Sequence, residues 1–419
     1  MSYKTVRGMR DFLPEKMKKK QFIEDFIRKV FEKYGFEPIQ TPIVEEFELL
    51  SAKDSGGEAV KNEIYYFKDK SERELGLRYD LTVPLARIVA SNQALTKPFK
   101  RYCIGQVYRY DRPQAKRYRE FTQADVDIVG AKSVLADFEC VQLACEIMRG
   151  LELDFKITVN NRKVLEALAI KMGVKKEQVK DAFRSIDKLD KIGEKGVKSE
   201  FKDKKIDERI LGQIFINSFD EVKEYLKDTE ALEELETLLT LSKENDLNEV
   251  EFDLSLARGL EYYTGNVFEI KLEEGPSVAA GGRYDKLVES YGGQDTPATG
   301  LSFGVDRLYD TLEETLVIGS NTDVFIVPLS KECVSTAFNL ASKIRSANIG
   351  VEVDLMQRNV KKNFEYMEKK GINFAIILGE NEIKENKFKL KNIQTREEKE
   401  FSFEDISDLL QEIKNLNKN

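Results

Sequence analysis

The chain has 419 residues, of which 41% are hydrophobic, and carries a formal net charge of −8 at pH 7. This length can bury more than one core, so we expect two or three domains rather than a small module held together by disulfides. No stretch approaches the roughly 20 apolar residues that span a bilayer, and residues 1–20 lack the apolar segment of a leader peptide. We therefore expect a cytoplasmic protein with no membrane partner, in which any polyanion must meet a local basic patch.

The residue types that are missing exclude several kinds of chemistry. The chain contains no histidine, which rules out a nucleophilic triad that uses one and a histidine general base. Its four cysteines form no C-x-x-C pair, so a zinc site would need all of them or added carboxylates: Cys103, Cys140, Cys145 and Cys333. We expect reduced thiols and no metal held by the protein alone. Glycine-rich loops of the P-loop or dinucleotide-binding type are also missing, so catalysis has to rest on electrostatics.

The first predicted elements are a helix and a long hairpin. Apolar residues recur at helical spacing between Glu15 and Tyr34, and Gly35 follows as a predicted C-cap. These apolar positions are Phe22, Phe26, Ile27, Val30 and Phe31. Short strand-like runs come next, followed by two long runs at 97–111 and 119–130. We predict that the two long runs pair as an antiparallel hairpin.

The predicted hairpin combines a polar strand face with a basic patch. Strand alternation over 121–129 places Gln123, Asp125 and Asp127 on one face and Ala124, Val126 and Ile128 on the other. The neighbouring strand and loop bring four arginines to the same region: Arg109, Arg112, Arg117 and Arg119. Arginine forks suit phosphates and carboxylates suit an ammonium, so the hairpin predicts a site for a zwitterion beside a polyphosphate. The alternative is an ordinary half-exposed strand.

Three further segments place polar residues or glycines next to turns. In GLRYDLTVPLAR, Asp80 and Thr82 stand just before a predicted helix, where they either cap the helix or hold a ligand's amino group. In AAGGRYDKL, two adjacent glycines form either a turn or a close approach of the backbone to a ligand. In TGLSFGVDRLYD, Arg307 falls in the opening turns of a predicted helix that follows an apolar strand.

The segment SLARGLEYYTG sets a cation, Arg258, close to the adjacent rings of Tyr262 and Tyr263. On its own, the segment predicts a turn into a buried strand. Beside a site for anions, it predicts a catalytic cation and an aromatic wall. If the strand continues through the two tyrosines, their rings point to opposite faces, and at most one of them lines the site directly.

Two stretches of the chain differ from the rest. Residues 171–248 are rich first in Lys and then in Glu, with Leu and Ile at intervals of three to four, which predicts a helical insertion with a solvated face. Strand-like sequence resumes at 250–272, so one sheet is expected to surround the insertion. From Asn321 onward, strands and helices alternate in the order βαβαβ, which predicts a compact α/β domain with a partly parallel sheet.

These motifs together resemble class II aminoacyl-tRNA synthetases and, within them, the histidyl-tRNA synthetase family. VYRYDRPQAKRYREFTQADVDIVG resembles motif 2 of the class, and GLSFGVDRL resembles its motif 3. LARGLEYYTG and AAGGRYD are similar to two histidine-specific signatures, and VRGMRDFLP is similar to the family's usual opening. The resemblance implies an α+β catalytic domain at 1–320 with an antiparallel sheet of six to seven strands, a helical insertion at about 171–248, and a C-terminal α/β anticodon-binding domain at 321–419.

The resemblance also implies a reaction and assigns residues to it. The family ligates L-histidine to tRNA(His) with ATP through a histidyl-adenylate intermediate, with Mg²⁺ accompanying the ATP, and it acts as a homodimer. By motif position, the catalytic residues are Arg258 and Arg109. The residues matched to histidine binding are Asp80, Leu81, Thr82, Arg109, Gln123, Asp127, Arg258, Tyr262 and Tyr263. Those matched to ATP are Arg109, Asp111, Arg117 and Arg307, and Gln114 matches the contact with the tRNA acceptor end.

A second interpretation is a histidine-sensing regulatory subunit of ATP phosphoribosyltransferase, which shares the catalytic fold of this family. Such subunits generally lack the anticodon-binding domain and lose the catalytic arginine. Because Arg258 and the segment 321–419 are both present, the sequence favours the synthetase.

Overall fold

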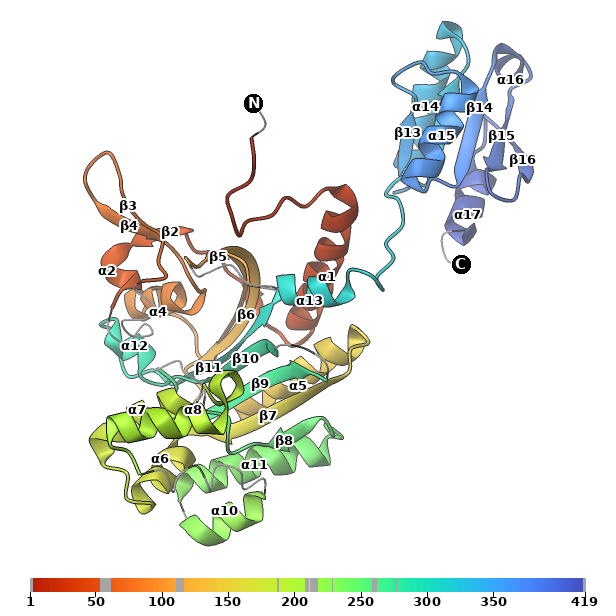
Figure 1. Cartoon of the computed structure of the whole chain (residues 1–419). Helices are drawn as coiled ribbons and strands as arrows, with labels where there is room; N and C mark the ends of the chain where they lie inside the picture. The colour runs from red at the N-terminus through yellow and green to blue at the C-terminus, as the bar shows by residue number, and fades with distance from the viewer. Residues whose placement is uncertain are drawn as a thin grey trace. The chain divides into compact units, whose positions relative to one another are not determined.

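The computed structural model of the chain describes residues 3–52, 62–110, 117–186, 188–207, 211, 218–227, 229–257, 262–273, 275 and 277–416. The chain divides into two compact units, Met1–Leu316 and Val317–Asn419 (Figure 1). Within the described ranges, no helix combines the length and the apolar character that a membrane span requires.

The first unit is built on an eight-stranded sheet in the order β1-β5-β6-β11-β10-β9-β7-β8. The six central strands are antiparallel, and the short strands β1 and β8 pair in parallel at the two edges. The predicted antiparallel sheet is therefore confirmed, with one short strand added at each edge. The strands are β1 (Glu37–Pro38), β5 (Phe99–Tyr108), β6 (Glu120–Val129), β11 (Ala298–Gly304), β10 (Ser277–Arg283), β9 (Asn266–Leu272), β7 (Phe155–Asn161) and β8 (Val250–Phe252).

β5 and β6 form the predicted hairpin, with Phe99 paired to Val129 at one end and Tyr108 paired to Glu120 at the other. The alternation along β6 also holds. Its apolar side chains, Ala124, Val126 and Ile128, are buried in the main hydrophobic core. The polar side chains between them therefore face the opposite side of the sheet.

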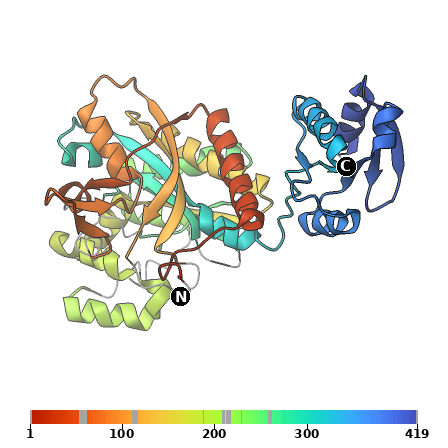
Figure 2. The ribbon, with the colours of Figure 1, turned by 90° about the horizontal axis from the view of Figure 1, so that it is seen from above.

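Three helices pack on the apolar face of this sheet: α1 (Pro14–Lys33), α5 (Leu135–Gly150) and α13 (Val305–Leu312) (Figure 2). Pro14 opens α1, where a missing N–H costs nothing, and the chain leaves the helix through Gly35 at φ 77°. The face of α1 that packs on the core carries Ile23 and Ile27, which are fully buried. Phe22 was expected on that face but is 44% exposed, because the buried stripe passes through its neighbour Ile23.

The polar face of the sheet is partly covered by α4 (Thr82–Ser91) and α12 (Leu287–Ser290). Apolar side chains of both helices pack on the ends of β6, β9 and β11, as the cluster of Leu85, Leu287, Val129, Val267 and Ala298 shows. Next to them lies a small antiparallel sheet of order β2-β4-β3 with the short helix α2. Their bounds are β2 (Val44–Glu46), β4 (Glu74–Leu77), β3 (Tyr66–Lys68) and α2 (Phe47–Leu50).

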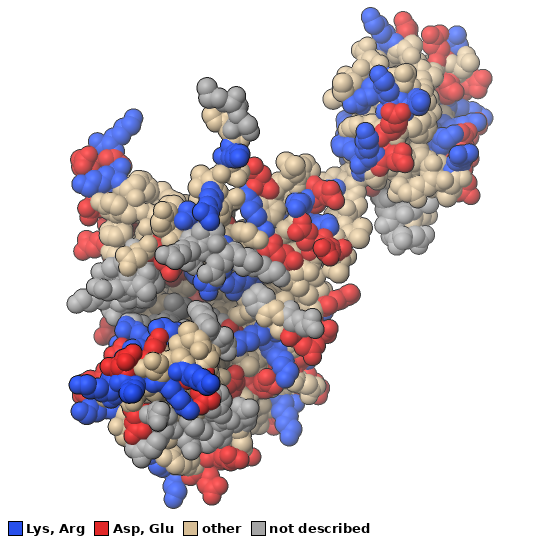
Figure 3. Space-filling view, viewed as in Figure 1, with Lys and Arg blue, Asp and Glu red and all other residues tan. Residues whose placement is uncertain are grey.

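The chain between β7 and β8 forms the predicted helical insertion. Its described elements are α6 (Arg162–Lys171), η2 (Lys176–Gln178), α7 (Val179–Ile186), α8 (Leu189–Lys204), α10 (Phe219–Leu226) and α11 (Glu230–Glu244). Three of these helices begin at side-chain caps, since Asn161 accepts from the Lys163 N–H, Ser218 from the Glu221 N–H and Thr229 from the Leu232 N–H. Figure 3 shows Lys and Arg side chains over α7 and α8 with acidic ones among them, as expected for a solvated face.

The second unit has a five-stranded sheet in the order β13-β12-β14-β15-β16. β12 pairs in parallel with β13 and β14, and α14 and α15 make the connections, so the predicted βαβαβ unit is confirmed. An antiparallel hairpin of β15 and β16 and a final helix extend the unit beyond the prediction. The elements are β12 (Val324–Pro328), η3 (Lys331–Cys333), α14 (Val334–Arg345), β13 (Val351–Val353), α15 (Val360–Lys370), β14 (Phe374–Leu378), α16 (Glu380–Lys384), β15 (Lys387–Asn392), β16 (Glu398–Ser402) and α17 (Ser407–Leu416).

Candidate active site

A cavity of about 480 Å³ lies on the polar face of the large sheet, over β6, β10 and β11. Its walls come from the segment that leads into α4 and from the start of α13. This volume is in the range of small-molecule sites. The predicted site residues that line the cavity are Asp80, Thr82, Arg109, Arg117, Gln123, Asp127, Tyr262, Tyr263 and Arg307.

The floor of the cavity is the polar face of β6, which carries Gln123, Asp125 and Asp127. Across the sheet, β11 sets Gly300 directly opposite Asp127. A Cβ atom at Gly300 would lie 2.0 Å from Asp127 Oδ1, so only glycine leaves room for this carboxylate. The adjacent strand β10 approaches as closely, since a Cβ atom at Gly281 would lie 2.1 Å from the carbonyl oxygen of Gly300. The two glycines of AAGGRYDKL therefore lie within a strand, and the turn that was an alternative for them is wrong.

A buried ion pair lies at one end of this floor. Arg101 is fully buried on β5, directly opposite Asp127, and its Nη2 lies 2.5 Å from Asp127 Oδ2. The Tyr284 hydroxyl donates to the other oxygen of the same carboxylate. Burial raises the pKa of Asp127, while Arg101 and the Tyr284 hydrogen bond act against that rise. Two donors thus hold this carboxylate in a fixed orientation.

Asp80 caps a helix and also lines the cavity. Its Oδ1 accepts from the Val83 N–H at 3.0 Å, in the first turn of α4. The carboxyl is 8% exposed, and burial raises its pKa to about 6 against the opposing effects of the Val83 N–H and Arg109. The sequence left two roles open for Asp80, a helix cap or a ligand contact. The structure allows both, because Oδ1 caps α4 while the side chain lines the cavity.

Leu81 lies outside the cavity, although it belongs to the same predicted set. Its side chain is 1% exposed and packs with Cys103 and Val107. The backbone carbonyl of Leu81 accepts from Arg101 Nη2 at 3.2 Å. Its part in the site is therefore indirect, through the position of Arg101.

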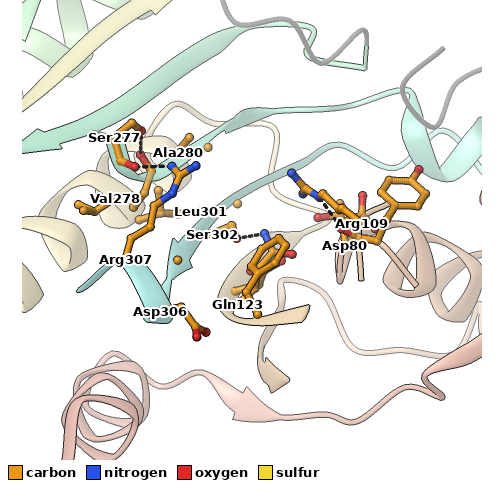
Figure 4. A pocket seen from close by; sticks show the side chains of 18 of the residues that line it. Asp80, Arg109, Gln123, Ser277, Val278, Ala280, Leu301, Ser302, Asp306 and Arg307 are labelled. Atoms are coloured by element: carbon orange, nitrogen blue, oxygen red, sulfur yellow. Dashed lines mark hydrogen bonds between the residues drawn. The ribbon is translucent and has the colours of Figure 1, made fainter. Parts of the chain in front are cut away.

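Three arginines bring positive charge to the cavity. Arg109 Nε donates to the Tyr79 carbonyl at 3.0 Å, and Arg307 Nη1 donates to the Ser277 carbonyl at 2.5 Å. Figure 4 shows Arg109 and Arg307 on opposite sides, with Gln123 between them. Arg117 also lines the cavity. Arg119, which was expected in the same group, instead lies over the Tyr110 ring at 4.3 Å and does not line the cavity.

Tyr262 and Tyr263 both line the cavity. Their ring centroids are 5.0 Å apart in an edge-to-face arrangement, and Tyr262 makes a similar contact with Tyr284 at 5.9 Å. The two rings were expected on opposite faces only if a strand continued through them. β9 begins only at Asn266, so strand alternation does not apply to the two tyrosines. Burial raises the pKa of the Tyr262 and Tyr284 hydroxyls, which therefore keep their protons as donors.

Some predicted residues lie outside the described part of the chain. Arg258, the predicted catalytic cation, is one of them. Asp111, Arg112 and Gln114 of the hairpin loop are the others.

The structure adds site residues that were not singled out from the sequence. Ser302 alternates with Leu301 and Phe303 along β11, so the same period-two argument used for β6 would have placed it on the cavity face. Asp306 also lines the cavity, and its carboxylate accepts from Arg10, Lys20 and the Thr122 N–H at 2.6, 3.2 and 2.7 Å. Nothing in the sequence marks these contacts, since Arg10 lies 296 positions away.

The described residues contain no group of three or more acidic or cysteine side chains placed to hold a metal ion. The four cysteines are buried and free, and burial raises the pKa values of Cys103, Cys140 and Cys145. Neutral thiols are poor metal ligands. The described residues therefore show no metal site, and the charged side chains that line the cavity, arginines together with aspartates, are available to bind a ligand that carries both charges.

Comparison with known proteins agrees with this geometry. Residues 8–308 match the family model of histidyl-tRNA synthetase, and residues 323–413 match that of an anticodon-binding domain. The chain is 36% identical over 427 residues to a histidine–tRNA ligase of Bacillus cereus, with 98% of this chain and 100% of the relative covered. It is 36% identical over 415 residues to the histidine–tRNA ligase of Methanocaldococcus jannaschii, with 97% and 99% covered.

A solved structure shows the same relationship. The crystal structure of histidyl-tRNA synthetase from Nostoc sp. PCC 7120 matches with a TM-score of 0.85 at 32% identity, over 99% of this chain and 100% of that one. The chain belongs to the histidyl-tRNA synthetase family.

Proposed function

We propose that this protein is a histidine–tRNA ligase, which activates L-histidine with ATP and transfers the histidyl group to tRNA(His). The observation that carries the proposal is the order of groups along one cavity. Tyrosines and the buried pair of Arg101 and Asp127 form one end, and Arg109 and Arg307 flank the other. Histidyl-adenylate has the same order, with an imidazole at one end and a phosphate further along, before the adenosine.

The imidazole end offers both hydrogen-bonding partners that a neutral ring needs. Asp127 is an acceptor, and the Tyr262 hydroxyl keeps a proton to donate, whereas the Tyr284 proton is already donated to Asp127. The edge-to-face rings of Tyr262 and Tyr263 supply an apolar wall for a flat ligand. We assign histidine binding to these residues, together with Asp80, Thr82 and Gln123.

Activation joins two anions, because the histidine carboxylate attacks the α-phosphate of ATP and pyrophosphate leaves. Fixed cations that meet the developing charge are the main contribution a protein can make to such a step. Arg109 is held by the Tyr79 carbonyl and faces the cavity, which suits a bridge between the carboxylate and the α-phosphate. We assign Arg307 and Arg117 to the rest of the triphosphate, and Arg258 to the transition state.

We infer that Mg²⁺ enters as part of the nucleotide substrate. Mg²⁺ usually keeps several waters and binds phosphate oxygens together with one or two carboxylates. Asp306, which precedes Arg307 in the chain, also lines the cavity, but Arg10 and Lys20 already pair with it. This arrangement supports phosphate oxygens and water, rather than a cage of protein ligands, as the main partners of the metal.

The tRNA is assigned to two parts of the chain. We propose that residues 321–419 are the anticodon-binding domain, in line with the family model matched there, and that Gln114 and its loop contact the acceptor end. We also propose that the protein is a cytoplasmic homodimer. Light scattering of the purified protein would test the dimer.

The test of the full reaction is aminoacylation of tRNA transcripts by the purified protein with radiolabelled histidine and MgATP. We expect charging of tRNA(His) and none of a tRNA for another amino acid. The regulatory-subunit interpretation, disfavoured by the presence of the second unit, predicts histidine binding without any charging.

A further inference from the structure

We propose that Asp125 is a third acceptor for the ammonium group of the bound amino acid, beside Asp80 and Gln123. Asp125 thereby makes the site selective for ligands that carry a free amino group. This inference rests on the proposed function, because it takes histidine as the ligand of the cavity.

Three buried acceptor atoms at the cavity floor have no hydrogen-bond donor among the described residues. Asp127 Oδ2 is paired with Arg101 by charge, which leaves Asp125 Oδ1 and Gln123 Oε1. Asp125 is 2% exposed and its side chain lines the cavity, so a ligand seated on the cavity floor would lie against it. A buried acceptor without a donor costs free energy, and buried polar groups in folded proteins are nearly always paired. A ligand that brings N–H groups to this point would satisfy both atoms.

Ser302 orients these two acceptors. Gln123 Nε2 donates to Ser302 Oγ at 2.7 Å, as Figure 4 shows, and the Ser302 side chain hydrogen-bonds Asp125. This bond uses one of the two N–H donors of the amide and fixes its orientation, and Gln123 Oε1, which has no donor among the described residues, remains available to a ligand ammonium. Ser302 thus positions two acceptors, Gln123 Oε1 and Asp125 Oδ1, which stand two residues apart on the same face of β6.

The place of Asp125 along β6 identifies which ligand group it meets. Asp127 lies beside Tyr284 at the tyrosine end, and Gln123 is paired with Gly304, three residues before Arg307, at the arginine end. Asp125 stands between them, about 7 Å from each along the strand. A ligand that reaches from the imidazole end to the phosphate end has its α-carbon in this middle zone, and the amino group is attached to that carbon.

The charges around Asp125 favour a cation. The charged and titratable groups that face it are Arg101 and Cys103 on β5, Asp127 on β6, and Asp80. The carboxylates of Asp80, Asp125 and Asp127 thus share the Arg101 guanidinium, and Asp80 also interacts with Arg109. Burial, with a further contribution from Asp127, raises the pKa of Asp125 to about 7, while Arg101 and Ser302 act against that rise. An ammonium has three N–H donors, and Asp80, Gln123 and Asp125 supply one acceptor each.

The experiment compares two ligands that differ only in the amino group. Histidine and 3-(imidazol-4-yl)propionate, which lacks the amino group, are titrated by calorimetry into wild-type full-length protein and into Asp125→Asn. We expect the variant to bind histidine on the order of 10- to 100-fold more weakly, as for the loss of one charge-assisted hydrogen bond. Binding of the amino-free ligand should change by less than about threefold, because that ligand makes no contact with Asp125.

The possible outcomes distinguish an error about Asp125 from an error about the proposed function. Equal losses for both ligands, or no loss for histidine, would overturn the assignment of Asp125 to the amino group. Failure of the wild-type protein to bind histidine would instead overturn the proposed function. Asp125→Ala is measured in parallel, and affinities are compared only for a variant that melts no lower than the wild type. Asp295→Asn is the matched control, because Asp295 is an exposed partner of Lys286 and should leave both affinities unchanged.

Discussion

Arg101 and Asp127 form an ion pair beneath the tyrosine end of the cavity, with 2.5 Å between Nη2 and Oδ2 and side chains that are 0% and 3% exposed. The two residues are direct cross-strand partners in the β5–β6 hairpin. Because water cannot screen them, each charge depends on the other for compensation. This dependence leads to the first prediction.

Replacing Arg101 by methionine should leave Asp127 buried beside Asp125 without a cation. Breaking one partner of a buried pair typically costs about 3–5 kcal/mol of unfolding free energy. We expect a loss of this size in urea unfolding of the first unit at pH 7. The control is Lys286→Met, which removes two exposed ion pairs and should leave the unfolding free energy nearly unchanged. Similar losses for the two variants would contradict the role given to Arg101.

The buried carboxyls should also make stability depend on pH. Burial raises the pKa of Asp125 to about 7, well above the value near 4 that is typical of an unfolded chain. The folded state therefore holds a proton that the unfolded state releases. The resulting stabilisation is complete below about pH 4 and is lost as the pH rises through about 7.

Asp125→Asn, which cannot ionise, should accordingly stabilise the protein without ligand at pH 8 by on the order of 1 kcal/mol or more. At pH 5 the gain should be much smaller, because the wild-type carboxyl is then largely protonated. Calorimetric melting of the first unit at the two pH values measures the difference. A gain that is the same at both values would show that the Asp125 carboxylate is not destabilised by burial.

The third prediction concerns the space that Gly300 leaves for Asp127. In Gly300→Ala the new methyl group would displace the Asp127 carboxylate, which lies 2.0 Å from its position. We expect the KM for histidine in pyrophosphate exchange to rise on the order of 100-fold, as for loss of a charged hydrogen-bonding group. The KM for ATP should change far less. Gly319→Ala is the control, since a Cβ atom at Gly319 meets nothing within 4 Å. An unchanged histidine KM in Gly300→Ala would remove Asp127 from the histidine site.

The fourth prediction concerns Arg10, which joins the N-terminal segment to the ATP end of the cavity. Its guanidinium donates to Asp306 and Asp310 and stacks on the Tyr118 ring at 3.4 Å. Because Asp306 precedes Arg307, Arg10→Met should raise the KM for ATP by on the order of 10-fold and leave histidine binding nearly unchanged.

Lys16→Met is the matched control for Arg10, since Lys16 pairs with the exposed Glu313 just beyond the same helix, α13. Calorimetric titration measures the affinity for histidine, and exchange kinetics with varied ATP measure the KM for ATP. An equal loss for histidine and ATP in Arg10→Met would indicate general unfolding rather than positioning of the ATP end.

The sequence predicted the elements whose residue patterns are local. Alternation along 121–129 placed Gln123 and Asp127 on one face, and the βαβαβ order of the second unit followed from short apolar runs between helices. Such patterns depend only on residues two to four positions apart, so they can be recognised in one amino-acid sequence.

The remaining features depend on contacts between distant residues. The pairing of Arg101 with Asp127 requires the register of the hairpin, which alternation alone does not determine. The contact of Arg10 with Asp306 joins segments 296 positions apart. The two tyrosines were expected on opposite faces only if a strand continued through them, and β9 starts only at Asn266. These are the places where tertiary packing overrides local pattern.

The central claim is that this cavity activates histidine with ATP, and the most direct test is histidine-dependent exchange of pyrophosphate into ATP by the full-length protein. Each of the twenty amino acids is supplied separately with MgATP and labelled pyrophosphate. The proposed function predicts exchange with histidine alone, and a loss of on the order of 10²- to 10³-fold in Arg258→Ala if that residue meets the charge of the transition state. No exchange with any amino acid, or exchange with a different one, would contradict the account.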